Sequence, residues 1–300
     1  MVRLFSFTTA LLMAVLALPA QAEEVKVPFQ GRTVNANLNI ADGKKLSDGV
    51  ILMLHGTLAH KDMEIMRSLQ DLMLERGFSN LAFNLGLAQN DRHGMVDCAA
   101  PHRHLDSNTV KEIAFWVAWL KEKGAGPITV LGHSRGGNQM ARYVAASPDP
   151  AVKRAVLVAP GTWEKGAESR GYKKSYKKDL GPLLARAEIL TLAGKGDTLM
   201  DDVDFVYCPK TTVAAATFVD YYKSNPDRDT PAVVDRAKVP VLVAAAANDQ
   251  VSPKIATKMK SHTSANVRLV VIPDAGHFFR DLVAEDLADH IQQFISGGSS

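Results

Sequence analysis

The sequence predicts an α/β fold in which a mostly parallel central sheet is flanked by helices. Short apolar runs typical of buried strands alternate along the chain with longer stretches whose apolar residues have helical spacing. In addition, 46% of the 300 residues are hydrophobic and 22% are charged, which is typical of a globular chain with a large core. Such alternation predicts right-handed crossovers between parallel strands, with helices on both faces of the sheet.

The expected elements follow in chain order. Residues 23–41 alternate apolar and polar side chains around a Gly-Arg turn, which predicts an antiparallel hairpin. The continuous apolar run at 49–57 predicts a strand buried on both faces of a parallel sheet. Further strands are expected at 78–86, 128–133, 153–160, 239–249 and 266–277. Helical spacing predicts helices at 62–77, 106–124 and 281–295, and another directly after residue 134. We expect Asp106 or Ser107 to cap the helix over 106–124.

Between Pro160 and Lys238 the alternation stops, and the chain becomes rich in charge, tyrosine and glycine. We interpret residues 161–237 as a helical cap inserted into a single domain that spans 23–300. The aromatic residues of this cap form either a substrate pocket or the contacts that dock it on the sheet; they are Tyr207, Phe218, Tyr221 and Tyr222. Its run of lysines and arginines over 165–178 is interpreted as a solvated face, the alternative being attraction to an anionic surface or substrate.

The first 22 residues have the pattern of a signal peptide. Arg3 precedes an apolar run that ends at Ala20, and Ala20-Gln21-Ala22 fits the small-x-small cleavage pattern. We therefore expect cleavage after Ala22 and a periplasmic or secreted protein. An uncleaved anchor is less favoured, because the uninterrupted apolar run is shorter than the roughly 20 residues that span a bilayer. No later segment is expected to be an integral membrane segment.

The two cysteines, Cys98 and Cys208, predict one disulfide in an exported chain. It would tie the loop after the strand at 78–86 to the insertion; two buried, unpaired thiols are the alternative. Neither a CxxC motif nor a Cys/His spacing indicates a metal site, so no metal is expected.

Gly132-His133-Ser134-Arg135-Gly136 joins an expected strand to an expected helix. In an open α/β sheet, functional groups gather where the strands end. A serine at so sharp a turn needs small neighbours two residues away on either side, and both are glycine. The helix that follows presents its positive amino terminus to developing negative charge. Ser134 is therefore the expected nucleophile, although a GxSxG pattern by itself is also compatible with a simple turn.

A serine nucleophile needs a base, and the base needs an acid that orients it. His277 follows the last expected strand and Asp249 follows the one before it, so we expect both beside Ser134. Asp274 is the alternative acid. The oxyanion is expected to bind the backbone N–H groups of Arg135 and Thr57, with Leu58 as the alternative to Thr57.

Other polar residues near these motifs have structural interpretations. His133 is expected to pack beneath the turn, and the Arg135 side chain is expected to form a salt bridge in preference to holding a substrate carboxylate. His102 and His104 are expected to line the mouth of the site or cap the helix in preference to binding a metal.

The matched segments "HGT" at 55–57, "GHSRGG" at 132–137, "ND" at 248–249 and "GH" at 276–277 resemble a serine hydrolase of the α/β-hydrolase superfamily. The resemblance runs from about residue 45 to the last helix, except in the cap, and implies the α/β-hydrolase fold. The single glycine after His55 is similar to the pattern of esterases, lipases and acyl hydrolases. Dehalogenases and epoxide hydrolases would carry aspartate in place of Ser134.

The sequence thus predicts an exported serine hydrolase that cleaves a carboxylic ester or related acyl bond of a small molecule through an acyl-enzyme, without a cofactor. A thioesterase, lactonase or peptidase with the same three side chains is an alternative, as is a non-catalytic binding protein on this fold. The formal net charge of +3 is too small to indicate nucleic acid as a partner.

Overall fold

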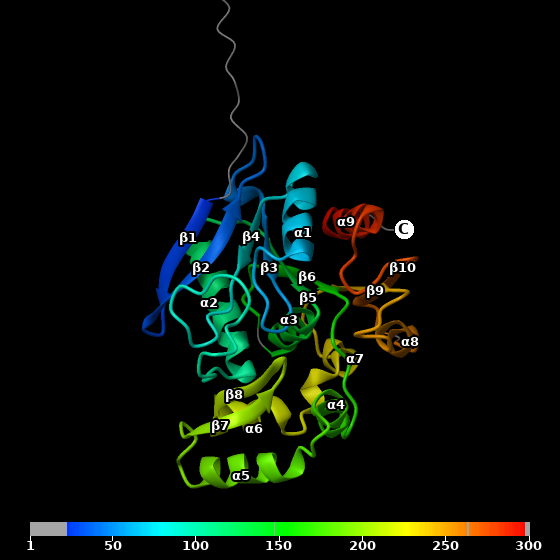
Figure 1. Ribbon diagram of the computed structural model, residues 1–300. Helices are drawn as coiled ribbons and strands as arrows, with labels where there is room; N and C mark the ends of the chain where they lie inside the picture. The colour runs from blue at the N-terminus through cyan, green and yellow to red at the C-terminus, as the bar shows by residue number, and fades with distance from the viewer. Residues whose placement is uncertain (1–22, 147, 263, 298–300) are drawn as a thin grey trace, which may run out of the picture.

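An eight-stranded sheet forms the centre of the computed structural model (Figure 1), which describes residues 23–146, 148–262 and 264–297. The signal peptide predicted at 1–22 lies outside the described residues. The strand order is β1-β2-β4-β3-β5-β6-β9-β10, with β1, β2 and β4 paired antiparallel and every other neighbouring pair parallel. The strands are β1 (Glu23–Phe29), β2 (Arg32–Asn39), β3 (Val50–Leu54), β4 (Asn80–Phe83), β5 (Ile128–His133), β6 (Val152–Val158), β9 (Val241–Ala246) and β10 (Val267–Ile272).

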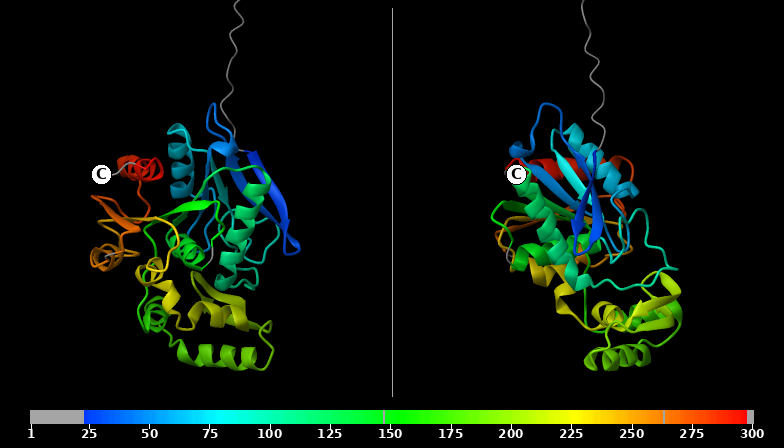
Figure 2. Two further views of the ribbon diagram at one scale, coloured as in Figure 1. Left: turned by 180° about the vertical axis from the view of Figure 1, so that it is seen from behind. Right: turned by 90° about the vertical axis from the view of Figure 1, so that its left-hand side faces the viewer.

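Helices cover both faces of this sheet (Figure 2), as the alternating pattern predicts. One face packs against α1 (Glu64–Glu75) and α9 (Leu282–Ile295). The other packs against α2 (Thr109–Glu122), α3 (Arg135–Ala146), α7 (Thr230–Val234) and α8 (Ile255–Lys260). The short helix α8 was not predicted.

The continuous apolar run of β3 is buried on both faces because successive side chains of a strand point to opposite sides. Leu52 and Leu54 belong to the core beneath α2 and α3, whereas Ile51 and Met53 belong to the core beneath α1 and α9. All of these side chains are at most 2% exposed. Packing on both faces therefore holds the inner strands in place, and these strands position the loops that follow them at the edge of the sheet.

The insertion lies below the sheet in Figure 1 and forms a hydrophobic core of its own. It contains α4 (Ala167–Tyr176), α5 (Gly181–Leu192), β7 (Leu199–Phe205), β8 (Cys208–Ala214) and α6 (Ala215–Tyr222), all within 161–237. The antiparallel pair β7–β8 was not predicted. Its register shifts between Met200 and Val203 and again before Phe205, and these irregularities remove the strict alternation by which a strand is found in a sequence.

The basic side chains over 165–178 are exposed, on α4 and in the segments that directly precede and follow it. Several of them pair with acids; Arg170 contacts Glu164, and Lys178 contacts Asp204 at 2.7 Å. This arrangement fits the interpretation of a solvated face. None of the helices in the described part of the chain is both long and apolar enough to cross a bilayer.

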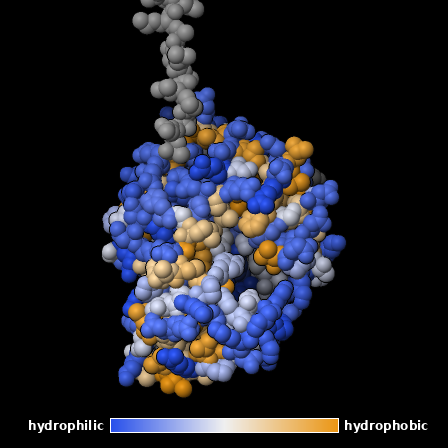
Figure 3. Space-filling model, in the orientation of Figure 1, coloured by the Kyte–Doolittle hydropathy of each residue, from blue (hydrophilic) through white to orange (hydrophobic). Residues whose placement is uncertain are grey.

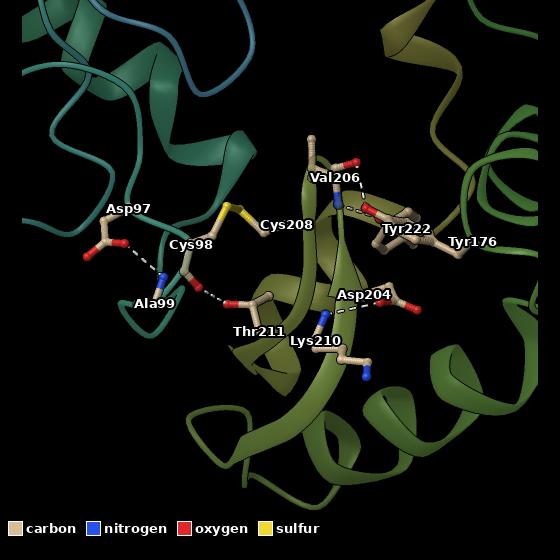
Figure 4. The surroundings of a disulfide bond; sticks show 10 residues. All are labelled: Asp97, Cys98, Ala99, Tyr176, Asp204, Val206, Cys208, Lys210, Thr211 and Tyr222. Carbon is tan, nitrogen blue, oxygen red and sulfur yellow. Dashed lines mark hydrogen bonds between the residues drawn. A yellow bond between two sulfur atoms is a disulfide. The ribbon is translucent and has the colours of Figure 1, made fainter.

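The predicted disulfide between Cys98 and Cys208 is present and joins the loop after β4 to the start of β8 (Figure 4). Two further contacts bind the same loop to the hairpin. The Thr211 hydroxyl donates to the carbonyl of Cys98 at 2.6 Å. His102 exchanges backbone hydrogen bonds with Thr212 and Ala214, each at 2.9 Å. The cap is therefore fastened to the sheet domain at a point far in sequence from its two ends.

Removing this disulfide by Cys98→Ser with Cys208→Ser is expected to lower the free energy of unfolding by about 4–5 kcal/mol, because the bond closes a long loop in the unfolded chain. The sequence separation of the two cysteines is 110 residues. Denaturant unfolding of the oxidised wild type and the double variant measures the loss. Wild type kept in reductant serves as the control and should match the variant. A loss below about 1 kcal/mol would contradict this role of the bond.

Candidate active site

Ser134 lies between β5 and α3 with a positive φ of 56°, a conformation that side chains other than glycine seldom adopt. Its N–H donates to the carbonyl of Val158 at 2.8 Å, which holds the turn against β6. A Cβ on Gly132 would lie 2.3 Å from the Gly136 carbonyl oxygen, and one on Gly136 would lie 2.3 Å from that of His55. Only glycine fits at these two positions, as the sequence pattern predicts.

The structure brings Ser134, His277 and Asp249 together. The Ser134 Oγ lies 3.0 Å from His277 Nε2, and His277 Nδ1 lies 2.8 Å from Asp249 Oδ2. An ionised carboxylate can only accept, so Nδ1 carries the hydrogen and Nε2 is free to accept from the serine hydroxyl. This is the arrangement that a serine nucleophile requires.

Both oxygens of the Asp249 carboxylate accept hydrogen bonds. Its Oδ1 accepts from the backbone N–H groups of Val251 and Ser252, each at 2.7 Å. Burial raises the pKa of Asp249, but the hydrogen bond from His277 and the two backbone donors outweigh it, so the pKa lies below its usual value. The alternative acid, Asp274, is exposed in the turn after β10, and no hydrogen bond between it and His277 is found among the described residues.

His133 holds the backbone of His277. Burial and the neighbouring His277 lower the pKa of His133 to about 4, so the ring is neutral. Its Nε2 lies 2.9 Å from the His277 carbonyl oxygen and, because a carbonyl only accepts, must donate. His133 therefore packs beneath the turn, as expected, and also fixes the segment that carries His277.

The loop after β3 packs directly on Ser134, since a Cβ on Gly56 would lie 3.2 Å from the Ser134 Cβ. Thr57 lines the same cavity as Ser134, whereas Leu58 is 4% exposed and does not. In the described part of the chain, the backbone N–H of Thr57 makes no hydrogen bond with protein. Of the two expected donors from this loop, the position of Thr57 fits the requirement better.

Arg92 and His55 brace this loop, a role that the sequence analysis missed. His55 Nδ1 donates to the Gly56 carbonyl at 2.8 Å, and His55 Nε2 accepts from Leu85 N–H at 3.1 Å and Arg92 Nη2 at 3.0 Å. Arg92 also donates to the carbonyls of Leu85 and Gly94. This largely buried network constrains the orientation of the Gly56–Thr57 peptide.

Glu112 lies buried near Arg92, where its Oε1 accepts from the Gly86 N–H at 2.9 Å. Burial raises the pKa of Glu112 to about 7, against the opposing effects of that hydrogen bond and of Arg92. The folded state thus binds this proton more tightly than the unfolded state. Its stabilising contribution is complete below the unfolded pKa of about 4.5 and is lost as the pH rises to about 7.

Relative to a Glu112→Gln variant, the wild type is therefore expected to lose about 2–3 kcal/mol of unfolding free energy between pH 5 and pH 8. Glutamine keeps an acceptor for the Gly86 N–H and does not titrate. Denaturant unfolding of both proteins at the two pH values measures the difference. An exposed carboxylate exchanged in the same way, Glu75→Gln, is the control. Parallel pH profiles for wild type and Glu112→Gln would contradict the raised pKa.

A cavity of about 350 Å³ opens at Ser134, between the sheet edge and the cap. Figure 3 shows the surface hollowed where the cap meets the rest of the molecule. Tyrosines form much of its wall; they are Tyr172, Tyr176, Tyr207, Tyr221 and Tyr222. Of the four aromatic residues singled out in the sequence, Phe218 does not line the cavity and belongs to the core of the cap.

Arg135 forms the predicted salt bridge and also lines the cavity. Its Nη1 lies 3.4 Å from Asp106 Oδ1, and its Nε donates to the Thr57 hydroxyl at 3.0 Å. Neither Asp106 nor Ser107 is the N-cap residue of α2 as we expected, since that position is Asn108. Burial raises the pKa of Asp106, but the charges of Arg135 and Arg142 outweigh this and hold it well below the usual value. Arg135, Gln139 and Arg142 share one helix face by their i, i+4, i+7 spacing, a signal that could have indicated a buried acidic partner.

His102 and His104 are buried between the sheet domain and the cap instead of lying at the mouth of the site. The ring of His102 lies 5.0 Å from that of Phe205, and His104 Nε2 forms a hydrogen bond with the Tyr221 hydroxyl at 2.9 Å. Burial lowers the pKa of His104 to about 3, so its ring is neutral. Both histidines thus help to dock the cap.

Comparison with solved structures identifies similar folds. Est1E from Butyrivibrio proteoclasticus with ferulic acid bound has a TM-score of 0.66 and 17% identity, over 91% of this chain and 98% of that one. The esterase Pf2001 of Pyrococcus furiosus has a TM-score of 0.60 and 16% identity, over 93% and 90%. DcsB in complex with its substrate analogue has a TM-score of 0.67 and 16% identity, over 93% and 99%. At these identities the likeness concerns the fold.

No curated protein sequence matches this one. The model of the alpha/beta hydrolase family, however, matches residues 51–290. This segment contains Ser134, Asp249 and His277, and the entire cap. Since the match covers most of the chain, the protein is a member of the alpha/beta hydrolase family.

Proposed function

We propose that this protein is an exported serine hydrolase that cleaves a carboxylic ester of a small molecule. The observation that carries the proposal is the chain of contacts from Ser134 Oγ to His277 Nε2 at 3.0 Å and from His277 Nδ1 to Asp249 at 2.8 Å. Ser134 also lines a cavity that is large enough for a small ester. The esterase Pf2001 among the similar structures supports the same reaction class.

In the first half of the reaction, Ser134 Oγ attacks the carbonyl carbon of the ester while His277 Nε2 takes the hydroxyl proton. The carbonyl oxygen becomes an oxyanion and accepts hydrogen bonds from the backbone N–H groups of Thr57 and Arg135. Each such donor contributes on the order of 10²–10³ in rate. Asp249 stabilises the imidazolium and keeps its ring in place. The bond to the leaving oxygen then breaks, and His277 returns the proton to the departing alcohol.

In the second half, water attacks the acyl-enzyme. His277 takes one proton of the water, and the oxyanion forms again in the same position. The bond between the acyl carbon and Ser134 Oγ then breaks, the serine oxygen regains the proton from His277, and the carboxylic acid leaves. General acid–base transfer by the histidine is worth roughly 10²–10⁴ in each half.

The disulfide between Cys98 and Cys208 supports export, because such bonds persist in oxidising compartments and are rare in the cytosol. Edman sequencing of the mature protein, or mass spectrometry of its intact chain, tests the proposed cleavage after Ala22. A mature chain that retains residues 1–22 contradicts it.

The same three side chains support thioester, lactone or amide cleavage, and the cavity alone does not distinguish these bonds. Initial rates with p-nitrophenyl esters of graded acyl length, and with matched thioester and anilide substrates, test the proposal. We expect the highest kcat/KM with an oxygen ester. Faster cleavage of the thioester or anilide would assign a different scissile bond, and no turnover of any substrate would favour a binding protein.

A further inference from the structure

We infer that the substrate carries an anionic group, a carboxylate in the simplest case, which binds the free edge of the Arg135 guanidinium inside the cavity. This inference rests on the proposed function and names the substrate class of the same site. It goes beyond the reaction type, because the chemistry at Ser134 needs only the backbone N–H of Arg135 and makes no use of its side chain.

The positive charge around Asp106 is not balanced. This carboxylate, 3% exposed, faces the guanidinium groups of both Arg135 and Arg142. Arg142 is the closer partner, at 2.6 Å from Oδ2, and Gln139 donates to Oδ1 at 2.8 Å. Arg135 reaches the same Oδ1 only at 3.4 Å. One carboxylate therefore meets two guanidinium groups, and the surplus charge lies on Arg135.

The surplus charge faces the cavity. The Arg135 side chain is 29% exposed and lines the cavity together with Ser134. Its Nε is held by Thr57 and its Nη1 by the long contact to Asp106, but Nη2 has no hydrogen-bond partner in the described part of the chain. The guanidinium carbon also lies 5.0 Å from the centre of the Tyr221 ring. A guanidinium with a free edge in such a place is a built site for a carboxylate.

The second arginine of the cavity wall, Arg228, does not offer such a site. Its Nη1 donates to Glu168 at 3.1 Å, and its Nη2 donates to the carbonyl of Asp220. The charge of Arg228 is therefore neutralised by Glu168, and its two terminal nitrogens bind residues of the cap, whereas its buried Nε has no partner among the described residues. Tyr221, whose ring the guanidinium faces, is neutral, since burial raises its pKa well above its usual value.

The position of Arg135 sets where the anionic group lies in the substrate. The guanidinium lines the same cavity as Ser134, and its Nε donates to Thr57, whose backbone N–H is the proposed oxyanion donor. We therefore expect the bound group to be only a few bonds from the scissile carbonyl. Short monoesters of dicarboxylic acids meet this requirement on the acyl side, and acyl esters of short hydroxy acids meet it on the alcohol side. The shared recognition chemistry is one carboxylate close to one ester.

The experiment compares pairs of esters that are matched in length, carry one ester each and differ in this charge. Monomethyl glutarate and methyl hexanoate form the acyl-side pair, and 4-acetoxybutanoate and pentyl acetate form the alcohol-side pair. We expect kcat/KM to favour the charged member of at least one pair by about 10- to 100-fold, the worth of a charge-assisted hydrogen bond. The preference should shrink as ionic strength rises, because salt screens the partly exposed guanidinium.

Arg135→Met should abolish the preference by lowering kcat/KM for the charged ester. Arg135→Lys should retain part of the preference, because lysine keeps the charge but lacks the planar guanidinium that donates two parallel hydrogen bonds. Arg170→Met removes an exposed arginine of α4 that does not line the cavity, and should leave the preference unchanged. If wild type hydrolyses the neutral esters but favours neither charged member, the inference is wrong while the proposed function stands. If no ester is hydrolysed, the result contradicts the proposed function itself.

Discussion

Replacing Ser134 with alanine is expected to lower kcat for ester hydrolysis by roughly 10⁴- to 10⁶-fold, since removal of the nucleophile leaves only binding and the oxyanion donors. The substitution removes one oxygen and leaves the backbone of the turn unchanged. Alanine also tolerates the positive φ about as poorly as serine, so little change in stability is expected from the backbone. Initial rates with the best ester of the acyl-length series measure the loss.

An exposed serine, Ser261, provides the matched control for this substitution. Its hydroxyl donates to the carbonyl of Lys258 at the end of α8, outside the cavity. Ser261→Ala should therefore keep the wild-type rate. A Ser134→Ala protein that folds and retains more than about a tenth of the activity would show that another group attacks the ester.

Replacing Asp249 with asparagine is expected to lower kcat by roughly 10³- to 10⁴-fold. Backbone N–H groups of Val251 and Ser252 both point at Oδ1, so the amide oxygen must take that position. The amide NH₂ then faces His277 Nδ1 and turns it into an acceptor. The hydrogen moves to Nε2, which can no longer take the proton of Ser134.

Asp274→Asn is the control for this substitution, because the sequence also offers Asp274 as the acid. It should leave kcat within a few-fold of the wild type. Thermal unfolding of both variants confirms that each is folded. Equal losses for the two variants, or a larger loss for Asp274→Asn, would contradict the role of Asp249.

The residues brought together at the site could be predicted because each combines a distinctive chemistry with a distinctive place. Ser134, Asp249 and His277 each follow a different apolar run, and parallel strands end at one edge of a sheet. The core strands were predictable for a related reason. Burial on both faces of β3 and β9 demands a continuous apolar run that a loop would not contain.

The residues that surround the site could not be predicted in the same way. Asp106 is typical of a helix cap in sequence, and only the packing of α2 against α3 brings it to Arg142. Arg92 lies in a loop without a pattern, and its partners His55 and Leu85 follow two different strands. The hairpin β7–β8 has bulges that remove its periodicity. In each case the determining contact is tertiary.

The central claim is that His277 activates the hydroxyl of Ser134, and labelling with a fluorophosphonate followed by peptide mass spectrometry tests it most directly. The serine oxygen displaces fluoride from phosphorus only where a neighbouring base removes its proton. We predict a single adduct, on Ser134, in the folded protein, and its loss both in His277→Ala and after unfolding in urea. A folded protein that stays unlabelled, or one labelled at Ser134 equally well without His277, would contradict the account.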